Sequence, residues 1–140
     1  MMTNERGMTL VEVMVAVTII TIGLTAIATG MQVATSGVAQ GQQQTTAVFL
    51  AEQHLEDVKA FALSTNTTQG WTNVTSANFP ATEAYGTIAN FSTYRRTTTI
   101  TTPTATTKRV SVSVFWKPVG VSTLSGERNV TVSTVLASRS

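Results

Sequence analysis

The sequence predicts an α+β protein in which a long N-terminal helix, half transmembrane and half amphipathic, packs on a small antiparallel β-sheet. Three observations carry this prediction. An apolar run covers residues 8–31, apolar residues recur at helical spacing within residues 32–63, and three stretches with strand character follow residue 90. With the apolar run set aside, about a hundred residues remain, enough for one small domain.

These segments predict one membrane anchor and one water-soluble head, residues 32–140. The polar residues 1–7 precede the anchor at residues 8–31. Within the head we expect a helix over residues 32–63, a variable connection over 64–90 and an antiparallel sheet over 91–137.

Composition excludes several kinds of site. The chain has nine basic and seven acidic residues, a formal net charge of +2, and no cysteine. The charge is too small and too scattered to indicate a nucleic-acid footprint. Without cysteine there is neither a disulfide framework nor a Cys-based metal or redox site, so the head must be held together by packing.

The apolar run from Met8 to Met31 contains a single charged residue, Glu12. As a helix it would be roughly 36 Å long, enough to cross a hydrocarbon core of about 30 Å with some tilt. A conventional secretory signal is a poor description, because its apolar region is shorter and its cleavage site follows that region. Here the candidate cleavage site, Gly7, precedes the run. A plain single-pass anchor leaves Glu12 unexplained.

Glu12 is the residue of this segment that most needs a partner. A carboxylate about one helical turn inside a bilayer costs several kcal/mol unless it is protonated or paired. Cleavage after Gly7 would create a new α-amino group on Met8, and positions i and i+4 of a helix share a face. The amine could therefore neutralise Glu12 within one subunit or from a neighbouring subunit. The second arrangement would couple insertion to assembly.

The segment from Gly7 to Val13, Gly-Met-Thr-Leu-Val-Glu-Val, resembles the processing site of type IV pilins and type II secretion pseudopilins. The resemblance covers the short polar leader ending in glycine, the apolar first mature residue and the glutamate at mature position five. It implies that a prepilin peptidase cuts between Gly7 and Met8 and methylates the new amine. It also implies that Glu12 sets the register of the subunit in a filament. Major pilins usually carry a proline further along this segment, whereas the first proline here is Pro80.

The second half of the predicted helix is amphipathic. Its apolar stripe consists of Val48, Ala51, Leu55, Val58 and Ala62. The segment from Leu50 to Glu56, Leu-Ala-Glu-Gln-His-Leu-Glu, is similar to the corresponding segment of PilV-type minor pilins and of pseudopilin I. Gly37 and Gly41 weaken the helix by about 1 kcal/mol each relative to alanine, so a bend is compatible with the sequence there.

Three stretches after the connection have strand character: Phe91–Thr102, Lys108–Lys117 and Asn129–Ala137. The middle one alternates most clearly, with Val110, Val112, Val114 and Trp116 on one face. We expect it to be a half-buried central strand covered by the helical stripe. The alternating valines of this stretch and of the last one again resemble the heads of PilV-type proteins and pseudopilin I.

The remaining histidine and basic residues are more typical of a solvated surface than of a catalytic or binding site. His54 is the only histidine, its acidic neighbours on the helix do not converge on it, and we expect it to be solvated. Arg95-Arg96 and Lys108-Arg109 could meet across a hairpin as a small basic patch that touches DNA, although a solvated face with edge protection is the simpler interpretation. No nucleotide-binding or nucleophile motif is present in the sequence. We therefore expect no enzyme, no cofactor and no metal.

The leading hypothesis is a minor subunit of a type IV pilus, acting in priming, tip structure or assembly. The alternative is a pseudopilin I-like subunit of a type II secretion system, in a periplasmic filament that drives protein export. A DNA receptor of a competence pilus is a third possibility. The resemblance implies other pilin or pseudopilin subunits, a prepilin peptidase, an inner-membrane assembly platform and the lipid bilayer as partners. It places the chain in the inner membrane by a single pass, with its head outside the cytoplasm.

Overall fold

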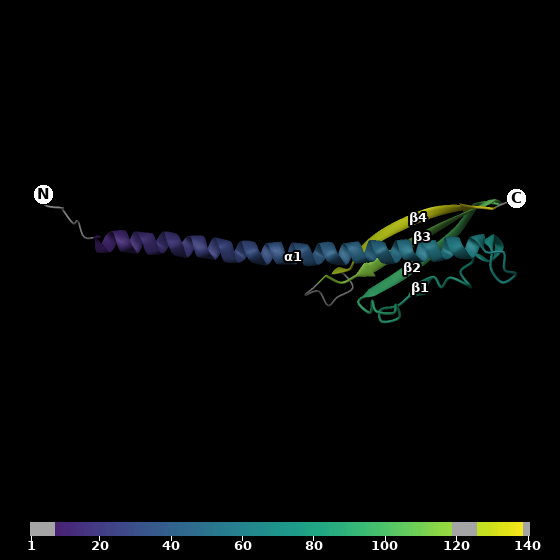
Figure 1. Ribbon diagram of the computed structural model, residues 1–140, viewed down its shortest axis with the longest axis horizontal. Helices are drawn as coiled ribbons and strands as arrows, with labels where there is room; N and C mark the ends of the chain where they lie inside the picture. The colour runs from purple at the N-terminus through teal and green to yellow at the C-terminus, as the bar shows by residue number, and fades with distance from the viewer. Residues whose placement is uncertain (1–7, 119–125, 139–140) are drawn as a thin grey trace. The chain divides into compact units, whose positions relative to one another are not determined.

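The computed structural model describes residues 8–118 and 126–138. Its elements are the helix α1, Leu10–Leu63, and four strands: β1, Thr82–Glu83; β2, Tyr94–Thr104; β3, Thr107–Trp116; and β4, Arg128–Ala137 (Figure 1). The sheet is antiparallel with strand order β1-β2-β3-β4. One long helix packed on an antiparallel sheet confirms the predicted α+β class.

The chain divides into two compact units, Met1–Ala39 and Gln40–Ser140. The helix α1 enters both, and it continues through Gly23, Gly30, Gly37 and Gly41 without interruption. The second unit contains the rest of α1, the connection and the whole sheet. Its core accordingly forms between the C-terminal part of α1 and one face of the sheet.

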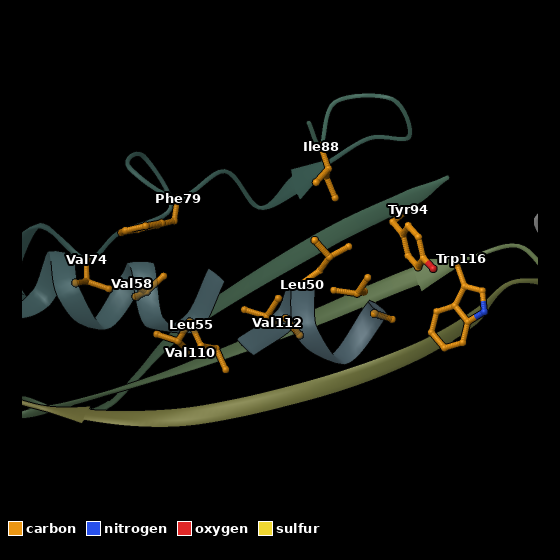
Figure 2. Packing of buried hydrophobic residues seen from close by; sticks show 13 residues of the cluster. Leu50, Leu55, Val58, Val74, Phe79, Ile88, Tyr94, Val110, Val112 and Trp116 are labelled. Atoms are coloured by element: carbon orange, nitrogen blue, oxygen red, sulfur yellow. The ribbon is translucent and has the colours of Figure 1, made fainter. Parts of the chain in front are cut away.

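The core consists of alternating side chains of β3 and one stripe of α1. Val110, Val112 and Val114 are fully buried, and Trp116 is nearly so. Opposite them on α1 lie Leu50, Leu55 and Val58 (Figure 2). Ala51 of the same helix belongs to the same cluster. The alternation predicted for residues 110–116 is confirmed, because the strand has one face on the helix and the other in solvent.

The connection between α1 and the sheet is mostly irregular, but three of its side chains complete the core. Val74, Phe79 and Ile88 are buried (Figure 2). Phe79 also meets the ring of Phe61 edge to face, with ring centroids 5.0 Å apart. The connection also holds a short 3₁₀ helix, Trp71–Asn73, and the strand β1, which pairs with Arg96 and Thr97 of β2. The fourth strand was not expected from the sequence.

The start of the connection is fixed by the end of the helix. Gly70 donates its backbone N–H to the carbonyl of Phe61 over 2.9 Å, which satisfies a carbonyl of the last helical turn. To do so Gly70 adopts φ +97, a conformation that other residues enter only with strain. A Cβ at this position would also lie 3.4 Å from the carbonyl oxygen of Ser64.

Lys108 ties the same connection to the sheet. It lies on the core-facing side of β3, is only 7% exposed, and donates from Nζ to the carbonyl oxygens of Trp71, Thr72 and Val74 over 2.9, 3.3 and 2.8 Å. Its ammonium also lies 4.6 Å from the centre of the Trp71 ring. Burial lowers the pKa of Lys108. A buried cation is tolerated here because three carbonyls and an aromatic face replace its water.

We predict that Lys108→Met destabilises the second unit by about 3 kcal/mol, because the aliphatic stem remains while three carbonyls lose their donor. The matched control is Arg109→Met, a neighbouring cation that is exposed on the opposite face of β3. Near-UV circular dichroism of the full chain in detergent would follow Trp71 and Trp116. The melting temperature should fall by roughly 10 °C or more in the first variant and stay close to wild type in the second. Equal melting of the two variants would contradict the role of Lys108.

Candidate processing and assembly site

The predicted processing residues lie where α1 begins. Gly7 lies outside the described residues, and Met8 and Thr9 precede the helix, which starts at Leu10. Thr9 is the N-cap: its Oγ1 accepts the backbone N–H of Glu12 over 3.3 Å, and its carbonyl accepts the N–H of Val13 over 3.2 Å. Threonine followed three residues later by glutamate is the sequence signature of a capping box. The helix therefore has a defined start beside the predicted scissile bond.

Glu12 lies in the first turn of α1, with an exposed side chain. A carboxylate in this turn interacts favourably with the positive end of the helix dipole, which offsets part of the cost of placing it near lipid. Met8 is outside the helix, so the amine predicted for it would not occupy a helical i, i+4 position in the chain as described. Pairing of Glu12 with an amine therefore stays a prediction.

The apolar part of α1 has no cover within its own unit. By length and composition α1 is the one helix of the described residues able to cross a membrane, with a mean hydropathy of 2.3 over its most apolar window and none of that window buried. Large apolar side chains such as Leu10, Ile19 and Ile27 are between 62% and 77% exposed. A surface of this kind requires lipid or other protein chains around it.

The polar residues of this segment are compatible with lipid. Thr18, Thr21 and Thr25 each donate their hydroxyl to the carbonyl four residues earlier, over 2.8 Å in every case. Thr29 bonds in the same way to the carbonyls of Thr25 and Ala26. Hydroxyls that are satisfied within the helix add little cost to insertion, since no donor is left to face hydrocarbon.

The structure corrects the expectation for His54. It is 8% exposed rather than solvated, its Nε2 lies 3.1 Å from Oγ1 of Thr98, and its ring meets Phe79 edge to face. Burial lowers the pKa of His54, and the positive charge of Arg96 lowers it further, whereas Glu83 and Asp57 act in the opposite direction. Within residues 8–118 and 126–138, no group of three or more His, Cys, Asp or Glu side chains is placed to hold a metal ion.

The basic patch that the sequence left open as an alternative does not form. Arg95 and Arg96 pair with Phe115 and Val114, at the opposite end of the β2–β3 hairpin from Lys108 and Arg109. The four cations therefore do not meet. Each arginine of the first pair is also matched by a carboxylate, because Arg95 binds Glu127 over 2.7 Å and Arg96 binds Glu83.

Glu127 is the centre of a cluster that sequence reasoning missed. Its carboxylate accepts the hydroxyl of Tyr85 over 2.7 Å and the guanidinium of Arg95, which in turn lies 3.8 Å from the centre of the Phe115 ring. The bond from Arg95 lowers the pKa of Glu127, and burial together with the bond to Glu127 raises the pKa of Tyr85 to about 12. The cluster joins the connection to the start of β4. It is a structural clasp, because Tyr85 and Arg95 both bond to the one carboxylate of Glu127.

Residues 2–28 match the prokaryotic N-terminal methylation motif, the prepilin-type signal. The match covers the predicted leader, the cleavage site, Glu12 and most of the apolar run. Comparisons with curated proteins and with solved structures found no match. The motif supports a type IV pilin or pseudopilin subunit, which is processed by a prepilin peptidase, anchored in a membrane and assembled with other such subunits.

The burial of His54 generates a pH prediction. Its folded pKa lies below its unfolded value of 6.5, so protonation favours the unfolded state. The stability that neutral His54 contributes is complete above about pH 6.5 and is lost as the pH falls through the folded pKa. Between pH 7 and pH 5 the melting temperature of the full chain in detergent should therefore decrease.

In His54→Gln, which keeps a hydrogen-bonding group beside Thr98, this decrease should disappear. No other histidine can titrate in this range, because His54 is the only one in the chain. Glu127 does not affect the comparison either, because its lowered pKa makes it titrate below this pH range. A decrease of the same size in both proteins would show that another group titrates.

Proposed function

We propose that this chain is a minor pilin of a type IV pilus, acting in priming, tip structure or assembly of the filament. The observation that carries the proposal is the prepilin-type motif at residues 2–28, which extends into the first part of α1, where none of the most apolar stretch is buried among the described residues. Such a helix suits a subunit that first resides in lipid and later packs in a filament. The role is structural rather than catalytic, as it is for the subunits that carry this motif.

The minor rather than major role rests on the sequence of the rest of the chain. It lacks the proline usual in the apolar segment of major pilins, and Leu50–Glu56 with the valine-rich β3 and β4 resembles PilV-type proteins. The second candidate is a pseudopilin I-like subunit of a type II secretion system, favoured by the same resemblance. Both candidates place the chain in the inner membrane with its head outside the cytoplasm.

In this proposal the processing residues are Gly7, Met8 and Glu12. Gly7 ends the leader, Met8 becomes the methylated N-terminal residue, and Glu12 sets the register against neighbouring subunits. The capping of the helix by Thr9 supports this assignment, because it leaves Met8 outside the helix, where a peptidase can reach it.

Processing is tested by mass spectrometry of the intact chain extracted from membranes. The expected mature protein lacks residues 1–7 and carries one added methyl group on Met8. Gly7→Val, which adds bulk beside the scissile bond, should keep Met1. The matched control is Gly23→Ala, since a Cβ there meets nothing within 4 Å and processing should be normal. Intact Met1 in assembled wild-type protein would refute the assignment.

The registry role is tested by Glu12→Ala. Insertion should persist or improve, because a charge leaves the apolar segment, while incorporation into sheared filaments should fall at least tenfold, equivalent to about 1.4 kcal/mol. Thr18→Ala serves as the control, since it alters the same segment without removing a charge. Wild-type incorporation of the Glu12 variant, with processing intact, would remove Glu12 from the mechanism.

A further inference from the structure

The two edges of the sheet differ in how they are protected. Along the β2 edge, β1 pairs with residues 96 and 97, and an irregularity with Pro103 interrupts the pairing of β2 with β3 between Thr101 and Thr104. Short partner strands, bulges and prolines are the usual devices that keep an edge from pairing with other chains. The other edge, β4, is ten residues long, without proline, and pairs with β3 in unbroken register from Arg128 to Ala137. It carries one charge, Arg128, at its start.

The backbone of β4 has a free side. Ser138 donates its N–H to the carbonyl of Thr106 over 2.7 Å, on the β3 side of the ladder. Antiparallel ladders alternate, so even-numbered residues of β4 bond toward β3 and odd-numbered ones direct their N–H and C=O groups outward. Among the described residues, β3 is the only strand paired with β4. The outward groups belong to Asn129, Thr131, Ser133, Val135 and Ala137.

A groove runs between this edge and the helix. One cavity of about 520 Å³ is lined by Lys59, Leu63 and Trp71 on one side and residues 134–137 on the other. A second, of about 290 Å³, is lined by Glu52, Glu56 and Lys59 together with residues 132–134. The two share Lys59 and Thr134, so they form one groove along β4. Val132 and Leu136, which lie on the groove side of the strand, are only half-buried.

The groove is polar at one end and apolar at the other. Beside Val132 the helix presents the exposed carboxylates of Glu52 and Glu56, and only Glu56 is paired, with Lys59 over 2.7 Å. Beside Leu136 the groove is lined by Leu63 at the end of the helix, which is 60% exposed, and by Trp71 of the connection. A complementary strand would place a basic side chain opposite Val132 and apolar side chains opposite Leu136. A second copy of β4, paired antiparallel about its centre, would instead bring the charge of Arg128 to the apolar end of the groove, beside Leu136.

We propose that β4 and this groove bind an extended strand from the head of a different filament subunit. The strand adds to the sheet through the outward backbone groups of β4 and fills the groove with alternate side chains, basic near Glu52 and apolar near Leu63. Main-chain bonds supply affinity, and the groove selects the partner. This inference rests on the proposed function, because the partner is a subunit of the same filament.

The test uses the absence of cysteine from the chain. The Ala137→Cys substitution introduces a single cysteine at the edge of β4 in the full-length chain. A benzophenone photo-cross-linker is attached to this cysteine in cells that produce filaments. Peptide mass spectrometry then identifies the cross-linked segment. We expect a segment of another filament subunit with strand-like alternation. Val135→Pro, which removes one outward N–H and leaves the bonds to β3, should lower the yield at least tenfold.

Val135→Thr keeps the N–H and is the matched control, with wild-type yield expected. A second pair of variants, Ser133→Pro and Ser133→Ala, repeats the comparison. If the melting temperature shows that one proline variant misfolds, the other still provides the test. Three results would overturn this inference and leave the proposed function standing. The first is an unchanged cross-linking yield in proline variants that fold. The second is the absence of any cross-link in chain that is processed and incorporated, and the third is a cross-link to a second β4 or to lipid. Unprocessed, unincorporated wild-type chain would overturn the proposed function and this inference with it.

Discussion

The constraint on which the rest of this molecule depends is that one continuous helix must satisfy two surroundings. Among the described residues of the unit Met1–Ala39, nothing covers the apolar side chains of α1, and the neighbouring threonine hydroxyls are satisfied within the helix. In the unit Gln40–Ser140 the same helix buries one stripe against the sheet. The first surface is stable only in lipid or among other chains, whereas the second is stable within the chain itself.

The second unit meets its own requirement without disulfides. Three fully buried valines of β3 and the stripe of α1 supply the apolar core. The irregular connection is then held by side chains far away in sequence, Lys108 at one place and the Glu127 clasp at another. These polar contacts add to the burial of Val74, Phe79 and Ile88, which packs the same segment on the core. Loss of a buried donor or acceptor there costs more than loss of an exposed charge, because its partners remain in the protein interior.

Periodic features of this fold could be predicted from the sequence, whereas features set by distant partners could not. The alternation in β3 follows directly from residues 110–116, and the long helix from its apolar run and stripe. His54 was assigned wrongly because its burial depends on Thr98, a partner 44 positions away. Lys108 was expected on a solvated face, because its burial depends on carbonyl oxygens of residues 71, 72 and 74, which lie more than thirty positions away. The two-residue strand β1 has too little pattern to be recognised.

The same distinction applies to the candidate site. Gly7, Met8 and Glu12 were assigned from a local motif, and the match over residues 2–28 supports that motif without testing the three roles. The capping by Thr9 follows from local sequence as well, since threonine and glutamate stand three residues apart. The groove beside β4 could not have been found this way, because it forms between a helix and a strand separated by more than sixty positions, as Glu52 and Val132 illustrate.

The most direct measurement is the exposure of α1 to lipid before and after assembly. A lipid-soluble photolabel, read out by peptide mass spectrometry, should modify residues 10–39 of the chain in membranes. In isolated filaments the labelling of the same residues should fall at least tenfold, and residues 40–63 should remain unlabelled in both states. If residues 10–39 escape the label in membranes, or stay equally labelled in filaments, the account of a helix that exchanges lipid for neighbouring subunits is contradicted.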